Sequence, residues 1–275
     1  MESARLDQLN LPLALAGAGK MGGALLRAWL AKGYDPRQIT VIEPYPSMEI
    51  VSLARERGLA FEQPSHPPRV LVLAMKPQSL EEAAASLDPL IDQGTLIISI
   101  LAGKTFAGLA RFLPRSGAIV RAMPNLPAAV GRGITALAAN PKVTTPQRAA
   151  AEALLGAAGR VEWLDGEHLI DAVTAVSGSG PAYVFYLAET LAEAGRALGL
   201  PADISARVAR ATVEGAGELL FQTPATSAAE LREQVTSPGG TTAAALEILM
   251  ASDGLAPLIE RALRAAKLRA EALAG

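Results

Sequence analysis

The sequence of 275 residues contains no cysteine and only two histidines, His66 and His168. Without cysteine the chain can form neither a disulfide bond nor a thiolate metal site. The two histidines lie far apart in the sequence, so they do not predict a zinc centre. We therefore expect no metal at the functional site.

The chain also lacks a large excess of charge of one sign, and it lacks long hydrophobic runs. The formal net charge is −2, without a block of like charges, which argues against a nucleic-acid surface and a membrane-surface patch. No apolar run approaches transmembrane length, and residues 1–10 lack the apolar core of a secretory signal. These absences predict a cytoplasmic protein that acts on a small molecule, with no nucleic-acid partner and no membrane contact.

Aromatic residues make up only 4% of a chain that is 50% hydrophobic, so aliphatic side chains must fill its core. In the first part of the chain, short apolar runs alternate with helical patterns, which is typical of a parallel sheet with right-handed crossovers. The sequence predicts strands at 11–16, 39–42, 69–74, 95–100, 118–122, 133–137 and 159–163. We expect an α/β domain over residues 1–165.

After residue 165 the strand patterns stop and long helical patterns follow. The expected helices cover 181–198, 203–221, 227–235, 242–251 and 255–273. Ser227 and Glu230 have the spacing of a capping box, which marks the start of the third of these helices. Residues 166–275 are therefore expected to form a separate all-helical domain.

A glycine-rich loop, Gly17-Ala-Gly19-Lys20-Met21-Gly22, follows the first predicted strand and precedes a helix. In that context the pattern G-x-G-x-x-G indicates a site for the pyrophosphate of a dinucleotide. The glycines permit a tight turn, a close approach of backbone to phosphate and close helix–strand packing, while the helix N-terminus offers free N–H groups. The alternative is a glycine-rich turn without a ligand. The context favours a dinucleotide-binding Rossmann domain, with Lys20 and Met21 in its cofactor site.

Glu43 ends the second predicted strand, about 20 residues after the last glycine of the loop. An acidic side chain at this place accepts hydrogen bonds from the adenosine ribose hydroxyls and repels a 2′-phosphate. The cofactor is thus NADH or NADPH, and Glu43 favours NADH. The alternative is a surface glutamate that opens the turn at 44–46.

Two further segments follow predicted strands, at the carboxyl edge of the sheet where open α/β sheets bind ligands. They are Ala74-Met-Lys76-Pro77-Gln78 and Ala122-Met123-Pro-Asn125-Leu-Pro127. Lys76 could reach a ribose or a carboxamide of the cofactor, or it could be a solvated surface charge. The sequence leaves both interpretations of Lys76 open.

A turn rich in hydroxyls and glycines, Thr236-Ser-Pro-Gly-Gly-Thr-Thr242, precedes another predicted helix. Backbone N–H groups at the helix start, with the side chains of Ser237, Thr241 and Thr242, form a suitable cradle for a carboxylate. An ordinary N-cap needs only one hydroxyl. Three hydroxyls beside two glycines therefore favour a ligand site over a simple cap.

Together these motifs resemble pyrroline-5-carboxylate reductases. The matching stretches are residues 17–22, 74–78, 121–128, 175–184 and 235–242. Ala175-Val-Ser-Gly-Ser-Gly-Pro-Ala-Tyr-Val184 and Val235 to Thr242 are far more specific than the glycine loop, which many dehydrogenases share. The resemblance spans almost the whole chain. It implies a Rossmann domain followed by an all-helical dimerisation domain whose partner subunit completes the active site, and rings of dimers occur in the family.

The resemblance also implies an enzyme of proline biosynthesis that transfers a hydride from NADH or NADPH to the cyclic imine 1-pyrroline-5-carboxylate, giving L-proline. The substrate carboxylate would bind Ser237, Gly240 and Thr241, and Thr242 would be the catalytic residue, hydrogen-bonded to the ring nitrogen. The cofactor site would include Lys76, Pro77, Met123 and Asn125, with residues 176–181 near the nicotinamide. A protonated imine is already electrophilic, so such a reaction needs orientation more than a histidine or a metal.

One segment departs from the family pattern. Between Gly58 and the third predicted strand, the family usually carries a longer stretch with a short helix and an asparagine that contacts the adenosine ribose. Here residues 61–68 are short and rich in proline, and we expect no helix. The adenosine end is therefore expected to be held differently.

Two alternative functions stay open at this point. One is a related imine or β-hydroxyacid oxidoreductase, which usually places a catalytic lysine in the helical part, whereas residues 183–220 contain no lysine. The other is an NAD(H)-binding sensor or scaffold without turnover, because a Rossmann domain alone does not prove catalysis. A sensor would have no need of the cradle at residues 237–242.

Overall fold

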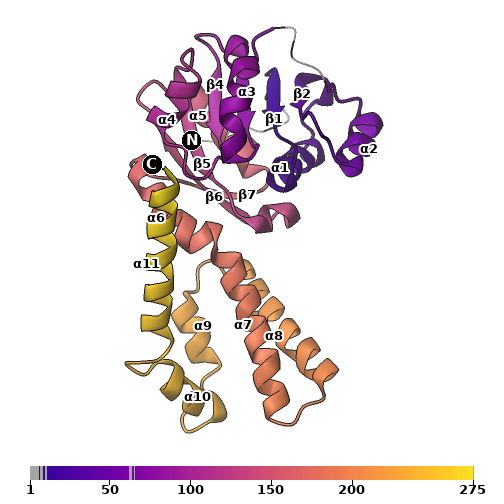
Figure 1. Cartoon of the computed structure of the whole chain (residues 1–275). Coiled ribbons are helices and arrows are strands. Elements are labelled where there is room, and N and C mark those ends of the chain that lie inside the picture. The colour runs from indigo at the N-terminus through magenta and orange to yellow at the C-terminus, as the bar shows by residue number, and fades with distance from the viewer. Residues whose placement is uncertain (1–5, 7–8, 10, 62–63, 65, 275) are drawn as a thin grey trace. The chain divides into compact units, whose positions relative to one another are not determined.

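The computed structural model describes residues 6, 9, 11–61, 64 and 66–274, in two compact units (Figure 1). Unit 1 takes the chain up to Gly178 and again from Ala266, and unit 2 is Ser179–Ala265. The last strand ends at Trp163. The boundary expected after residue 165 stays a prediction, since the strands end close to it and the compact unit continues to Gly178.

Unit 1 contains a seven-stranded sheet in the order β2-β1-β3-β4-β5-β6-β7. The strands are β1 Leu13–Ala16, β2 Ile39–Ile42, β3 Val70–Leu73, β4 Leu96–Ser99, β5 Ala118–Met123, β6 Gly133–Ala139 and β7 Gly159–Trp163. Every residue of β1, β3, β4 and β5 is buried, because helices cover both faces of the sheet. The apolar runs of the sequence therefore predicted these strands within one to two residues.

The helices of unit 1 lie on the two faces of this sheet (Figure 1). They are α1 Lys20–Ala31, α2 Met48–Arg57, α3 Leu80–Leu87, α4 Phe106–Phe112, α5 Thr145–Gly156 and α6 Ile170–Val173. One core cluster joins Trp29 of α1 and Leu154 of α5 to one face of the strands. The other joins Leu80 of α3 and Leu109 of α4 to the opposite face. This three-layer arrangement is a Rossmann-like α/β fold, as the sequence predicts.

The parallel sheet that the sequence predicts has one exception at β6, which runs antiparallel to β5. The connection between these strands, from Pro124 to Arg132, holds only a 3-10 turn at Leu126–Val130. A parallel crossover needs a dozen or more residues and usually a helix. The short connection therefore returns β6 antiparallel, while the other pairs in the sheet are parallel.

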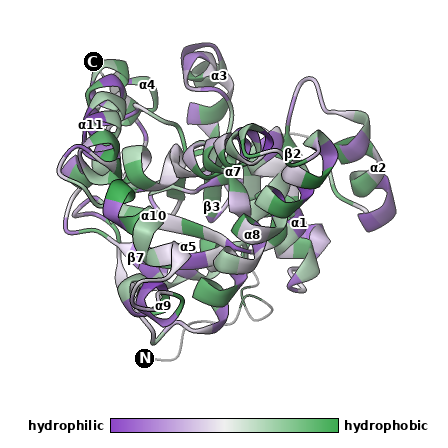
Figure 2. Ribbon diagram, turned by 90° about the horizontal axis from the view of Figure 1, so that it is seen from below, coloured by the Kyte–Doolittle hydropathy of each residue, from purple (hydrophilic) through white to green (hydrophobic). Residues whose placement is uncertain are grey.

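Unit 2 consists of helices, as expected. They are α7 Gly180–Ala197, α8 Ala202–Gln222, α9 Ala228–Gln234 and α10 Thr241–Leu249, followed by α11 Leu255–Ala274, which ends in unit 1. Helices α7 and α8 pack along each other (Figure 1). The capping box is present at the start of α9, where Ser227 accepts from the Glu230 N–H and Glu230 accepts from the Ser227 N–H. Figure 2 shows hydrophobic and hydrophilic segments alternating along the ribbons of these helices.

The segment after α2 bears on the cofactor site, because it pairs with β2, the strand that precedes Glu43. Among its described residues there is no helix between Gly58 and Val70, as expected. Ala60 instead pairs with Thr40 as a parallel bridge, and the Val41 N–H donates to the Ala60 carbonyl at 2.9 Å. Residues 62, 63 and 65 of this segment lie outside the described part of the chain.

Candidate active site

The glycine loop forms a tight turn between β1 and α1. Gly17 has a φ of +95°, and a Cβ atom there would lie 2.6 Å from the Ala74 carbonyl carbon at the end of β3. A side chain at Gly22 would collide with the Gly17 carbonyl oxygen. Both glycines are thus required by the close packing of loop, helix and neighbouring strand.

Gly19 has a different role in the loop. A Cβ atom at Gly19 would meet no atom of the described chain within 4 Å, so its surroundings are open. Gly19 is the N-cap of α1, no side chain caps this helix, and its first turn contains no acidic residue. Open space beside uncapped N–H groups suits a pyrophosphate, which fits the dinucleotide that the sequence predicts. Lys20, the first residue of α1, is exposed, and Met21 is half-buried.

Glu43 lies directly beyond β2 and holds the glycine loop. Its Oε2 accepts the Ala18 N–H at 2.9 Å, and its Oε1 accepts the Tyr45 N–H at 3.1 Å. The carboxylate therefore fixes the first turn of the loop as well as the turn that follows β2. Each oxygen retains a second lone pair, so the carboxylate can still accept a hydrogen bond from a ribose hydroxyl.

Lys76 and Pro77 follow β3 at the same edge of the sheet. Lys76 is exposed, and Pro77 begins a 3-10 turn at Pro77–Ser79 that leads into α3. The exposure of Lys76 agrees with either of the interpretations that the sequence leaves open.

Met123 and Asn125 lie at the carboxyl end of β5, where Met123 is buried and Asn125 half-buried. The Asn125 Oδ1 accepts the Ile134 N–H at 3.0 Å, and its Nδ2 donates to the Ser177 Oγ at 3.1 Å. Ser177 belongs to a π-helical turn, Thr174–Gly178. Such turns are rare in proteins, and those that occur are often at functional sites. The specific motif at Ala175–Val184 thus begins in contact with the segment that follows β5.

An ion pair between a buried arginine and a half-buried glutamate anchors the segment that leads to this π-helical turn. Arg121 of β5 is 4% exposed, and its Nη1 lies 2.8 Å from the Glu167 Oε2. The same oxygen accepts the Phe106 N–H at the start of α4, at 2.9 Å. Glu167 lies outside every motif that the sequence singles out. The signal that could have pointed to Glu167 is Arg121 itself, because an arginine within a buried strand needs an acidic partner.

The hydroxyl-rich turn of unit 2 precedes α10 as expected. The Gly240 N–H donates to the Ser237 carbonyl at 3.0 Å, with Pro238 and Gly239 at the central positions and Gly239 at a φ of +69°. Gly240 is the N-cap of α10, and no side chain caps the helix. Ser237 and Thr241 are exposed and Thr242 is half-buried. The first N–H groups of α10 therefore lie beside three hydroxyl side chains.

The predicted site residues fall into two groups, one in each unit. The carboxyl ends of β1, β2, β3 and β5 bring the glycine loop, Glu43, Lys76 and Asn125 to one edge of the sheet, because these strands run parallel. Ser237, Gly240, Thr241 and Thr242 form the second group, at the start of α10. In the described part of the chain no cluster of acidic or histidine side chains could hold a metal ion.

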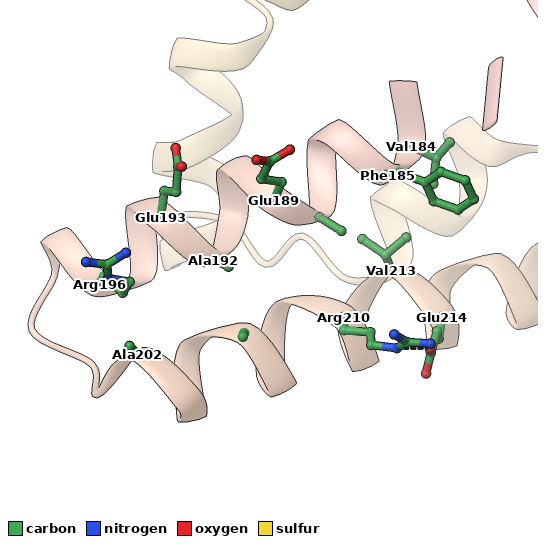
Figure 3. A pocket seen from close by; sticks show the side chains of 12 residues that line it. Val184, Phe185, Glu189, Ala192, Glu193, Arg196, Ala202, Arg210, Val213 and Glu214 are labelled. Carbon is green, nitrogen blue, oxygen red and sulfur yellow. Dashed lines mark hydrogen bonds and ion pairs between the residues drawn. The ribbon is translucent and has the colours of Figure 1, made fainter. Parts of the chain in front are cut away.

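Unit 2 also contains an open groove of about 580 Å³ between α7 and α8 (Figure 3). Apolar side chains line one end, where Val184 and Phe185 of α7 lie near Val213 of α8. Arg196 lines the other end. On α8, near Val213, the Arg210 Nε donates to the Glu214 Oε1 at 2.7 Å. The predicted site residues do not line this groove.

A Rossmann-like unit with an open glycine cradle, joined to a helical unit, defines an oxidoreductase that depends on a nicotinamide dinucleotide. Two family models agree. The one described as NADP oxidoreductase coenzyme F420-dependent matches residues 12–103, and the one described as pyrroline-5-carboxylate reductase dimerisation matches residues 167–273. None of the helices in the described part of the chain is long and apolar enough to cross a membrane.

Similarity extends over the whole chain. Pyrroline-5-carboxylate reductases of Pseudomonas aeruginosa and Synechocystis are 38% and 40% identical to it, covering 95% and 96% of this chain and 96% and 99% of theirs. A pyrroline-5-carboxylate reductase structure from Coxiella burnetii has a TM-score of 0.88 at 34% identity, covering 96% of this chain and 99% of that one. That of Plasmodium falciparum pyrroline carboxylate reductase, with NADP bound, has a TM-score of 0.79 at 25% identity, covering 97% and 99%. The chain belongs to the pyrroline-5-carboxylate reductase family.

Proposed function

We propose that this chain reduces 1-pyrroline-5-carboxylate to L-proline, with unit 1 binding the coenzyme and the start of α10 binding the substrate. The observation that carries the proposal is the uncapped start of α10 beside Ser237, Thr241 and Thr242. A helix N-terminus attracts a carboxylate through its free N–H groups and its dipole. Membership of the family supplies the substrate class.

The substrate carboxylate is held by Ser237, Gly240 and Thr241 in this proposal. The Thr242 hydroxyl oxygen accepts a hydrogen bond from the protonated ring nitrogen, which keeps the imine charged and oriented. The bound coenzyme supplies the hydride to the imine carbon. Since a protonated imine is already electrophilic, no histidine and no metal is needed for this step.

The coenzyme is held at the carboxyl edge of the sheet. Gly17, Gly19, Lys20, Met21 and Gly22 hold the pyrophosphate, and Lys76, Pro77, Met123 and Asn125 contact the rest of the cofactor. Support for the pyrophosphate site comes from the open space at Gly19 and the uncapped start of α1. The proposed substrate site depends on self-association, for which the dimerisation domain provides the support. A ring of dimers and a cytoplasmic location stay predictions.

NADH is the preferred coenzyme in this proposal. The Glu43 carboxylate, fixed by the Ala18 and Tyr45 N–H groups, would accept from the ribose hydroxyls and repel a 2′-phosphate. Arg27 of α1 pairs with Glu49 of α2 at 2.9 Å. The structure with NADP bound belongs to the Plasmodium relative and does not decide the preference of this chain.

The proposed function is tested by mixing the purified full chain with 1-pyrroline-5-carboxylate and either NADH or NADPH, and following the loss of coenzyme absorbance. Imine-dependent oxidation with at least one coenzyme is expected, faster with NADH at equal concentration. A matched assay with proline in place of the imine controls for background oxidation. Absence of imine-dependent oxidation with both coenzymes would contradict the proposal.

A further inference from the structure

The hydrogen bonds of Asn125 have a fixed direction. Because the Ile134 N–H is a donor, the group facing it must be the amide oxygen of Asn125. The amide nitrogen then faces Ser177, and Asn125 donates to the Ser177 Oγ at 3.1 Å. Ser177 is thus an acceptor in this bond, and its own proton is left for another acceptor.

A serine or threonine in a helix can give this proton to a backbone carbonyl one turn earlier. Thr174, in the same π-helical turn, does so, since its Oγ1 donates to the Ile170 carbonyl at 2.8 Å. Thr212 and Thr223 of unit 2 behave in the same way. No such bond is recorded for Ser177 among the described residues, although it is half-buried. Its hydroxyl is therefore set up to donate to a ligand.

The surroundings of Ser177 are those of the proposed nicotinamide site. Asn125 lies at the carboxyl end of β5, which is the edge of the sheet that carries the glycine loop. Gly178 packs over Met123, because a Cβ atom at Gly178 would lie 3.5 Å from the Met123 Sδ. Behind this surface, the ion pair of Arg121 and Glu167 fixes the turn from which the π-helical turn continues.

We propose that the Ser177 hydroxyl donates a hydrogen bond to the carboxamide oxygen of the nicotinamide, and that Asn125 is a positioning residue that directs the Ser177 proton outward. The inference rests on the proposed function only in that a nicotinamide coenzyme occupies this edge of the sheet. The relay runs from the Ile134 N–H to Asn125, from Asn125 to Ser177, and from Ser177 to the coenzyme.

The test compares NAD⁺ with thionicotinamide adenine dinucleotide, in which sulfur replaces the carboxamide oxygen and accepts hydrogen bonds weakly. Dissociation constants are measured by isothermal titration calorimetry on the full chain, without substrate. The wild type should bind NAD⁺ more tightly than the thio analogue. Ser177→Ala should weaken NAD⁺ about ten-fold, the cost of about one hydrogen bond, and the thio analogue by less than about two-fold. The dissociation constant of the thio analogue divided by that of NAD⁺ should therefore fall well below its wild-type value.

A second variant tests the direction of the relay. In Asn125→Asp, one carboxylate oxygen still accepts the Ile134 N–H, while the other can only accept from Ser177 and so turns the proton of Ser177 inward. The added charge affects both coenzymes alike, so the ratio of the dissociation constants is the readout. This ratio should fall below its wild-type value, as in Ser177→Ala.

The control is Ser86→Ala, because the Ser86 Oγ donates to the Ala83 carbonyl at 2.9 Å on the surface of α3. It should leave both constants unchanged. Equal weakening of NAD⁺ and the thio analogue in Ser177→Ala, or a wild-type ratio in Asn125→Asp, would overturn the inference. Binding is measured without turnover, so these results are independent of whether the chain reduces 1-pyrroline-5-carboxylate.

Discussion

The two units differ in how much of their apolar surface they bury within one chain. In unit 1 the strands β1, β3, β4 and β5 are wholly buried between helices. In unit 2 the helices α7, α9 and α10, all described, contain no buried residue. Large side chains such as Phe185 and Ile248 are 61% and 74% exposed. Unit 1 has a core of its own, whereas unit 2 leaves many large apolar side chains exposed, as an interaction surface does.

The largest expected effect comes from placing a charge on the apolar end of the groove between α7 and α8. Phe185→Asp should abolish self-association and lower imine reduction by about 100-fold or more, because burying an unpaired carboxylate costs several kcal/mol. Binding of NAD⁺ to unit 1 should change by less than about two-fold. Analytical ultracentrifugation, activity and calorimetry measure the three quantities.

Met48→Asp is the matched control for Phe185→Asp. Met48 is also an exposed apolar side chain, at 80%, but it lies in unit 1. The control should stay in the wild-type oligomeric state. If Phe185→Asp also keeps that state and its activity, the contrast drawn between the units is wrong.

Thr242→Ala tests the substrate contact in unit 2. Loss of one polar contact to the ring nitrogen should lower kcat/KM by about ten- to a hundred-fold, on the order of 1–3 kcal/mol, with coenzyme binding unchanged. The control is Thr223→Ala, whose hydroxyl donates to the Leu219 carbonyl within α8. Steady-state kinetics at saturating coenzyme give the comparison. Equal kinetics for Thr242→Ala and wild type would remove Thr242 from the site.

Glu43 is the corresponding test in unit 1. Glu43→Ser should raise the use of NADPH relative to NADH by about ten-fold, since the carboxylate that repels the 2′-phosphate is gone. Glu43→Gln keeps an oxygen for one of the two N–H donors but loses the charge, so it separates repulsion from loop support. The ratio of kcat/KM values for the two coenzymes is the measurement. An unaltered ratio in both variants would return Glu43 to a purely structural role.

The last prediction concerns the core of unit 1 at high pH. Tyr34 is 2% exposed and donates to the Leu11 carbonyl, and burial raises its pKa to about 12. The unfolded chain releases this proton near pH 10, so the free energy of unfolding should fall by about 1.4 kcal/mol per pH unit between pH 10 and 12. Tyr34→Phe should flatten that slope.

Urea titrations at several alkaline pH values measure the slope for the wild type and Tyr34→Phe. Tyr186→Phe, at a tyrosine of unit 2 that is 65% exposed, should leave the slope as in the wild type. A slope that persists in Tyr34→Phe would assign the alkaline dependence to other groups.

Much of unit 1 could be predicted because a buried parallel strand appears as a continuous apolar run and the glycine loop has a fixed spacing. The direction of β6 could not be predicted from its own residues, since it depends on the length of the connection before it. Helices α2, α4, α5 and α6 were not predicted. The signals for α2 and α5 were the N-cap serine Ser47 and the capping box of Thr144 with Gln147.

The site was predicted as a set of residues but not as a set of contacts. The position of Glu43 after its strand was expected, whereas its bonds to the Ala18 and Tyr45 N–H groups depend on how the loop closes. The bond between Asn125 and Ser177 joins residues 52 apart in the chain. Long-range contacts of this kind leave no local pattern in the sequence.

The most direct test of the proposed reaction follows the hydride itself. NADH that carries deuterium at the transferred position is incubated with the full chain and 1-pyrroline-5-carboxylate, and the proline formed is examined by mass spectrometry and NMR. Proline with a single deuterium on the ring carbon that formed the imine double bond is the expected product. Proline without deuterium, or no proline, would contradict the account.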